Sequence, residues 1–100
     1  MIFKAREKFG KQVRLTKERW NHIIDRHPEI KPHLSKIKIA IQEPEIIIEN
    51  PYNKNEKYYH KYFKGLKNFL IVILETNKKF IITAFIARKR KKGKISWGKN

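Results

Sequence analysis

Two histidines and two arginines lie close together in the segment 19–27. They are His22 and His27, with Arg19 and Arg26. A histidine side chain has an ordinary pKa of about 6.5, so it can take or give a proton at neutral pH. An arginine guanidinium can hold a phosphate through two parallel hydrogen bonds. This group could therefore bind a phosphate and move a proton beside it. A plainer interpretation is that His27 only caps a helix and that His22 is a solvated surface residue.

The same histidines do not suit a metal site. His22 and His27 are five positions apart, which is the wrong spacing for two ligands on one helical turn. His33 and His60 are distant in the sequence, and Asp25 is the only aspartate. The chain has no cysteine, so a disulfide, a thiolate metal site and a cysteine nucleophile are excluded. We expect neither a metal nor a cofactor.

The charge of the chain points to an anionic partner. Its 100 residues carry 25 Lys and Arg against 9 Asp and Glu, a net charge of +16. Such a field attracts polyanions, of which nucleic acid is the first candidate, an anionic membrane the second and an acidic protein the third. No apolar run approaches the ~18–20 residues that cross a membrane. The basic residues also do not lie on one amphipathic helix, which disfavours binding to a membrane surface. We expect one soluble, cytoplasmic domain that spans residues 1–100 and has no membrane partner.

The segment 57–64 is dense in aromatic side chains, which are interleaved with three lysines. Successive residues of a strand face opposite sides, so one set joins the core and the other is exposed. Exposed rings can stack on bases while neighbouring lysines hold phosphates. The candidate RNA-binding residues of this segment are Tyr59, His60 and Lys61.

A third group lies near the end of the chain. Thr83 is the single polar side chain in the apolar segment 80–87 and could hydrogen-bond a phosphate, although threonine is also a good strand residue. Five consecutive basic residues follow, which could clamp phosphates, bind an acidic protein or simply keep that surface solvated. A period of two places the first of them opposite Thr83 unless a bulge intervenes. They are Arg88, Lys89, Arg90, Lys91 and Lys92.

The spacing of apolar residues predicts the helices and strands that position these groups. Thr16 is a good N-cap and Pro28 a helix stop, which predicts a helix that ends at His27. A second helix is predicted from near Pro32 to Pro44. We therefore predict an α+β fold, with two N-terminal helices packed on a four- to five-stranded antiparallel sheet. The expected strands are 45–49, 57–63, 69–76 and 80–89, with a short closing strand at 95–97 and a further short strand possible at 12–15.

Most of the chain, from Val13 to Trp97, carries motifs that resemble those of one protein family. The motifs are Leu-Thr-x-x-Arg-Trp-x-His-Ile-x-x-Arg-His-Pro-Glu at 15–29, Glu-Pro-Glu-x-Ile at 43–47, the Tyr-Tyr pair at 58–59, Ile-Thr-Ala-Phe at 82–85 and Lys-Lys-Gly-Lys-Ile-x-Trp at 91–97. The chain resembles the phage-associated branch of the barnase–EndoU–colicin–RelE-like nucleases. That resemblance implies a small barnase/RelE-like α+β domain and a metal-independent ribonuclease, often a toxin or phage-conflict effector. The motif positions it carries over are His22, Arg26, His27 and Thr83.

We therefore predict a metal-independent endoribonuclease. His27 or His22 would take the proton of a ribose 2′-hydroxyl, which would attack the adjacent phosphorus and leave a 2′,3′-cyclic phosphate. Arg26, with Arg88 or a lysine of 89–92, would stabilise the phosphorane, and Thr83 would hydrogen-bond the phosphate. The expected partners are RNA and, as a second candidate, an acidic antitoxin protein. The alternative is an RNA- or DNA-binding module that uses the same basic face without chemistry.

Overall fold

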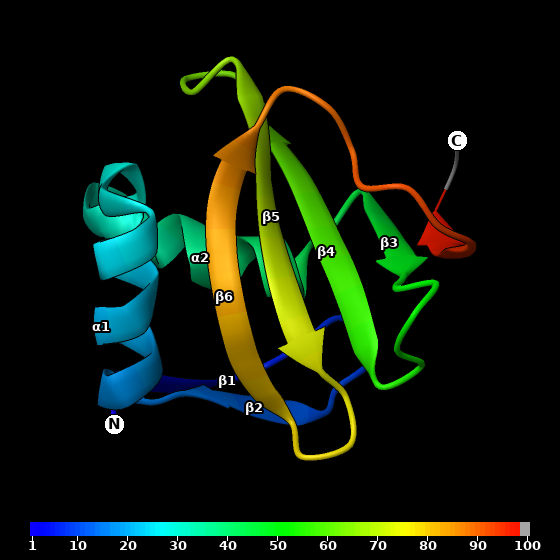
Figure 1. Cartoon of the computed structure of the whole chain (residues 1–100), viewed down its shortest axis with the longest axis horizontal. Helices are drawn as coiled ribbons and strands as arrows, with labels where there is room; N and C mark the ends of the chain where they lie inside the picture. Colours follow the sequence, from blue (N-terminus) through cyan, green and yellow to red (C-terminus); the bar gives the residue numbers. More distant parts are fainter. Residues whose placement is uncertain (99–100) are drawn as a thin grey trace.

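The structure is a computed structural model and describes residues 1–98 (Figure 1). Two strands come first, followed by helices and then by five more strands. The elements are β1 (Phe3–Arg6), β2 (Gln12–Leu15), α1 (Lys17–Arg26), the 3-10 helix η1 (Pro28–His33), α2 (Leu34–Gln42), β3 (Ile46–Glu49), β4 (Glu56–Phe63), β5 (Asn68–Glu75), β6 (Phe80–Ala87) and β7 (Ile95–Gly98).

The expected sheet architecture is wrong. The described residues form one seven-stranded mixed sheet in the order β1-β2-β6-β5-β4-β3-β7, in which β2 pairs with β6 in parallel. The hairpin β1–β2 precedes the helices, so the helices are not N-terminal. The error has a physical reason. In β1 charged and apolar side chains alternate over only four residues, and Ala5 alone is buried, so the strand is defined by its pairing with β2 rather than by its own pattern.

The helices begin and end where local chemistry allows. The Thr16 hydroxyl accepts a hydrogen bond from the Arg19 N–H, and α1 stops at His27 before Pro28, which confirms the predicted cap and stop. The second predicted helix is divided. Residues 28–33 form a 3-10 turn with Pro32 inside it, and α2 starts only at Leu34.

Both helices pack on one face of the sheet. The larger core joins Ile23 of α1 and Ile41 of α2 to Leu70, Val72 and Ala84 of the central strands. In Figure 1 α2 crosses behind β4 and β5, while α1 stands beside β6. The other face of β4–β6 carries no helix in the described chain. Its smaller apolar cluster contains Ile46, Ile48, Tyr58 and Ile71. No helix among residues 1–98 is long and apolar enough to cross a membrane.

Candidate functional site

The helix-free face of the sheet is the candidate site, and we call it the open face. Strand register arranges its central residues in two rows across β4, β5 and β6. These rows are Tyr58–Ile73–Thr83 and His60–Ile71–Phe85. Thr83 and Phe85 are both partly exposed, so this face is open to a ligand at the β6 side.

His27 reaches the open face from the end of α1. Its backbone N–H donates to the Ile23 carbonyl at 2.7 Å, which ends the helix. The imidazole ring packs against Phe85 with 5.5 Å between ring centres, and the side chain stays 35% exposed. Its Nδ1 lies 3.9 Å from a carboxylate oxygen of Glu29, which is beyond hydrogen-bond range. Glu29 thus lies on the Nδ1 side of the ring, where it can pair with a protonated imidazole.

The basic residues reach the open face on a loop. Residues 88–94, here the basic loop, run from the end of β6 to β7 at the far edge of the sheet (Figure 1). The Lys91 N–H donates to Nε2 of His60 at 3.0 Å, which attaches the loop to β4. The Glu49 N–H donates to the Lys94 carbonyl at 2.9 Å and attaches it to β3. Gly93 has a φ of +152°, and a Cβ there would collide with the Glu49 carbonyl oxygen, so the loop lies against β3.

This attachment places a cation over the open face. The Lys91 ammonium lies 5.2 Å from the centre of the Tyr58 ring and 5.9 Å from the centre of the Phe85 ring. An ammonium is attracted to the negative face of an aromatic ring at such distances. Because His27 packs on the same Phe85 ring, an imidazole and an ammonium both contact one aromatic ring, from segments 64 positions apart in the sequence.

His60 is locked in one neutral form by its surroundings. It is fully buried, and because Nε2 accepts the Lys91 N–H, the proton sits on Nδ1, which donates to the Tyr58 carbonyl at 2.9 Å. Burial lowers the pKa of His60, and the positive charges of Arg90 and Lys91 lower it further, against two backbone hydrogen bonds that raise it. His60 therefore holds the loop and does not carry charge at neutral pH.

Not every residue predicted for the site reaches it. Arg19 donates from Nε and Nη2 to the Ile82 carbonyl at 3.1 and 2.7 Å, so its guanidinium ties α1 to β6. Tyr59 is 2% exposed on the helix-covered face, with Lys61 partly exposed on that same face. His22 and Arg26 are exposed on α1. Every residue of the basic loop is exposed, including the five that the sequence singled out, which are Arg88, Lys89, Arg90, Lys91 and Lys92.

Sequence reasoning did not assign the aromatic floor of the site. Phe85 stands two residues after Thr83, and the period of two puts both on one face. Tyr58 lies beneath Lys91, and burial raises the pKa of its phenol, with a further contribution from Glu56. Glu29, beside the His27 ring, is a third residue that the sequence did not assign, and it directly follows the His-Pro pair. Phe85 lies in the Thr-Ala-Phe motif and Glu29 in the His-Pro-Glu motif, but no local pattern showed that the two motifs lie close together.

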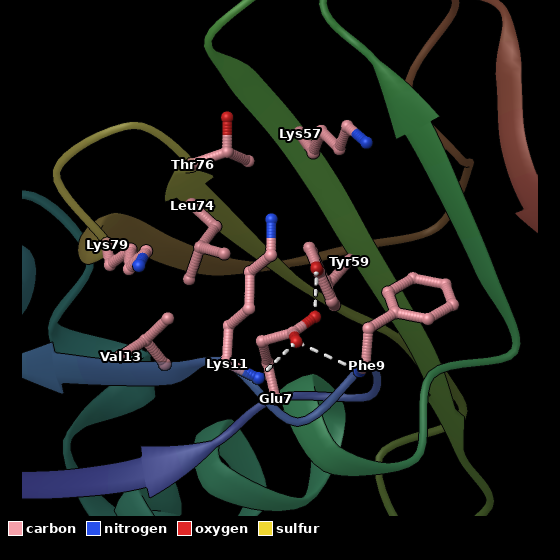
Figure 2. A pocket seen from close by; sticks show the side chains of 9 residues that line it. All are labelled: Glu7, Phe9, Lys11, Val13, Lys57, Tyr59, Leu74, Thr76 and Lys79. Atoms are coloured by element: carbon pink, nitrogen blue, oxygen red, sulfur yellow. Dashed lines mark hydrogen bonds between the residues drawn. The ribbon is translucent and has the colours of Figure 1, made fainter.

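A separate pocket of about 200 Å³ opens on the other side of the sheet (Figure 2). At its base the Glu7 carboxylate accepts the Tyr59 hydroxyl at 2.6 Å and the N–H groups of Phe9 and Lys11 at 2.9 Å each. Burial, followed by the hydrogen bond and the charge of Glu7, raises the pKa of Tyr59 well above its usual range. Glu7 thus anchors the β1–β2 turn to β4 through three hydrogen bonds within the fold.

Within residues 1–98, no group of three or more His, Asp or Glu side chains is arranged to hold a metal ion. Comparisons of the chain with models of protein families, with curated proteins and with solved structures find no match.

Proposed function

We propose that this chain is a metal-independent endoribonuclease of the barnase–EndoU–colicin–RelE-like type. The observation that carries the proposal is that His27 and Lys91 both contact the Phe85 ring, at 5.5 and 5.9 Å from its centre. Cleavage of RNA by attack of a ribose 2′-hydroxyl on the adjacent phosphodiester requires a proton acceptor and a cation at one site. The His-Pro-Glu motif supplies His27, the Thr-Ala-Phe motif supplies the Phe85 ring, and the basic loop supplies Lys91.

In the proposed reaction, Nε2 of His27 takes the proton of a ribose 2′-hydroxyl. The 2′-oxygen attacks the adjacent phosphorus, the bond from phosphorus to the 5′-oxygen breaks, and the 5′-oxygen leaves with a proton from the Lys91 ammonium. The products are a 2′,3′-cyclic phosphate and a free 5′-hydroxyl. The Glu29 carboxylate beside Nδ1 stabilises the imidazolium that forms.

Lys91 and its neighbours stabilise the charge that develops on phosphorus. The ammonium is fixed above the sheet before a substrate binds, because His60 holds the loop through the backbone of Lys91. Charge that is positioned in advance lowers the barrier most effectively, since little has to reorganise during the reaction. Thr83 lies on the same face and hydrogen-bonds the phosphate, while Arg88 extends from the end of β6 and Arg26 from the last turn of α1.

The test is cleavage of a mixed pool of cellular RNA in EDTA, with His27→Gln and His22→Gln as a matched pair. Both changes remove an imidazole from the first helix or its cap, and circular dichroism checks that each variant folds. We expect His27→Gln to lower the cleavage rate by roughly 10²–10⁴-fold. His22→Gln should stay within about twofold of the wild type, because His22 is exposed on α1 away from the Phe85 contact. Mass spectrometry of the fragments should find 2′,3′-cyclic phosphate ends.

The opposite ranking of the two variants would move the base to His22. RNA that stays intact with all three proteins, but shifts in a native gel, would replace the nuclease by the binding module that shares its basic face.

A further inference from the structure

Two hollows flank the middle of the basic loop. The first has a volume of about 570 Å³ and lies between the loop and the sheet edge. Its floor is apolar, formed by Ile46, Ile48, Phe69 and Ile95, and its walls are the basic residues 89–92 with Gly93. An apolar floor beneath a cationic rim suits a flat ring that is tethered to an anion.

The second hollow, of about 410 Å³, lies on the other side of the same residues. Arg90, Lys91 and Lys92 line both hollows, while Tyr52 and Tyr58 are the aromatic residues of the second. Both volumes fall in the range of about 300–1,000 Å³ that is usual for small-ligand pockets. Three consecutive cationic side chains therefore separate two aromatic or apolar hollows.

Tyr52 is presented to the second hollow in an unusual way. Its side chain is 94% exposed, the most exposed of the large apolar side chains among residues 1–98. The turn that carries it is nevertheless ordered by side-chain hydrogen bonds. The Tyr52 N–H donates to Asn50 Oδ1 at 2.9 Å, and the amides of Asn50 and Asn53 donate to the two oxygens of Glu56 at 3.0 and 3.1 Å. An ordered turn that holds a ring in solvent is a platform on which another ring can stack at low entropic cost.

We infer that the two hollows are base subsites and that the substrate is single-stranded RNA. This inference rests on the proposed function. One unpaired base enters the hollow over Ile46, Ile48 and Phe69. A neighbouring base stacks on Tyr52. The connecting phosphate lies along Arg90–Lys92, in reach of the Lys91 ammonium. Base–aromatic stacking tolerates every base, so the subsites select for an unpaired strand more than for a sequence.

A duplex cannot use these subsites. Its bases are paired and stacked on one another, and only its grooves and backbone are presented to a protein. The basic loop would still attract its phosphates, but Tyr52 and the apolar floor would find no exposed base face. Base subsites should therefore bind an unpaired strand more tightly than a duplex, and this preference should depend on Tyr52. A surface that is only cationic would show no such preference.

The experiment measures equilibrium binding by fluorescence anisotropy with a 2′-O-methyl RNA oligonucleotide at one fixed salt concentration. The methyl group removes the attacking hydroxyl, so the probe is bound but not cleaved. We expect Tyr52→Ala to weaken binding roughly 5- to 100-fold and Tyr52→Phe to change it by less than about twofold, because the ring is kept. The wild type should bind the same strand at least about tenfold more tightly than its duplex, and Tyr52→Ala should lose most of that preference.

Phe9→Ala is the matched control, because Phe9 is another exposed aromatic residue, 57% exposed, and lies outside both hollows. It should bind as the wild type does. Equal binding by Tyr52→Ala and the wild type, or equal affinity of the wild type for strand and duplex, overturns the inference even if RNA is cleaved. Tyr52-dependent binding of the probe together with intact RNA in the cleavage assay would retain the subsites and remove the nuclease.

Discussion

His60 shows how one buried side chain can control a surface loop. It is enclosed by β3, β4 and the basic loop, with the Phe69 ring at 6.2 Å. Both ring nitrogens are engaged in the neutral form, and the charged groups nearest to it are the cations Arg90 and Lys91. A proton added to Nε2 would face the Lys91 N–H, which is itself a donor. Protonation would therefore oppose the contact that holds Lys91 over the open face, against the backbone hydrogen bonds to Tyr58 and Ile46 that favour the charged ring.

The first prediction at the residue scale is a loss of stability in mild acid. The folded state lowers the pKa of His60, so below about pH 6.5 the unfolded chain binds a proton that the folded chain does not. The free energy of unfolding should therefore fall between pH 6.5 and 5.5, with a slope from this residue of at most about 1.4 kcal/mol per pH unit. Urea unfolding across that range measures it, above the range in which most carboxylates titrate.

His60→Gln is the control for this slope, because its amide keeps one acceptor and one donor but does not titrate. A His60→Gln protein with the same pH slope as the wild type would contradict the assignment to His60.

At the scale of elements, the position of His27 depends on how α1 is fixed to the sheet. The register of β5 and β6 shifts between Ile73 and Leu74, which leaves Ile82 without a partner residue on β5. The Ile82 carbonyl is then taken by two donors of the Arg19 guanidinium. This bulge and its arginine connect α1 to the strand that carries Thr83 and Phe85.

Arg19→Ala should destabilise the protein by roughly 1.5–3 kcal/mol, the range for hydrogen bonds to a charged group, as measured by urea unfolding. Arg19→Lys should recover only part of this loss, because an ammonium cannot reproduce the two-pronged geometry of a guanidinium. Arg26→Ala removes the same charge from an exposed position on the same helix, so it isolates the effect of charge. Equal stability of Arg19→Ala and Arg26→Ala would show that the bond to Ile82 contributes nothing measurable.

At the scale of the whole molecule, the net charge of +16 dominates long-range behaviour. It draws polyanions toward the protein over a distance set by the ionic strength, and it opposes compaction by repulsion within the fold. Few acidic groups offset it. Affinity for RNA must therefore be interpreted together with the salt concentration, whereas the stacking on Tyr52 should be nearly independent of salt.

We expect the logarithm of the association constant for the 2′-O-methyl strand to fall linearly with the logarithm of salt concentration. Each phosphate contact contributes a slope of about −0.7 for a single strand. Lys92→Gln should make the slope less steep by about that amount, while Lys4→Gln, exposed on β1 outside both hollows, should leave it unchanged. Anisotropy titrations at several salt concentrations give the slopes. Identical slopes for Lys92→Gln and the wild type would remove the basic loop from the RNA interface.

The sequence predicted those parts of the fold that depend on near neighbours. The Thr16 cap, the Pro28 stop and the period-two strands around residues 57–63, 69–76 and 80–89 each follow from residues a few positions apart. Their existence was predictable because capping and side-chain alternation act within one turn or one pleat. The possible strand at 12–15 is β2, but β1 and its pairing with β2 were not predicted, because this short hairpin is stabilised by β6 and by the Glu7–Tyr59 bond across 52 positions.

The candidate site was also only partly predictable from the sequence. The sequence shows histidines near arginines, a lone threonine in an apolar strand, a basic run and the charge that attracts an anion. Only the tertiary structure decides that His27 and Lys91 both contact Phe85, that His60 is buried beneath the loop and that Arg19 holds α1 to β6. The physical reason is that local patterns set which elements form, whereas the burial of their apolar faces sets which distant residues become neighbours.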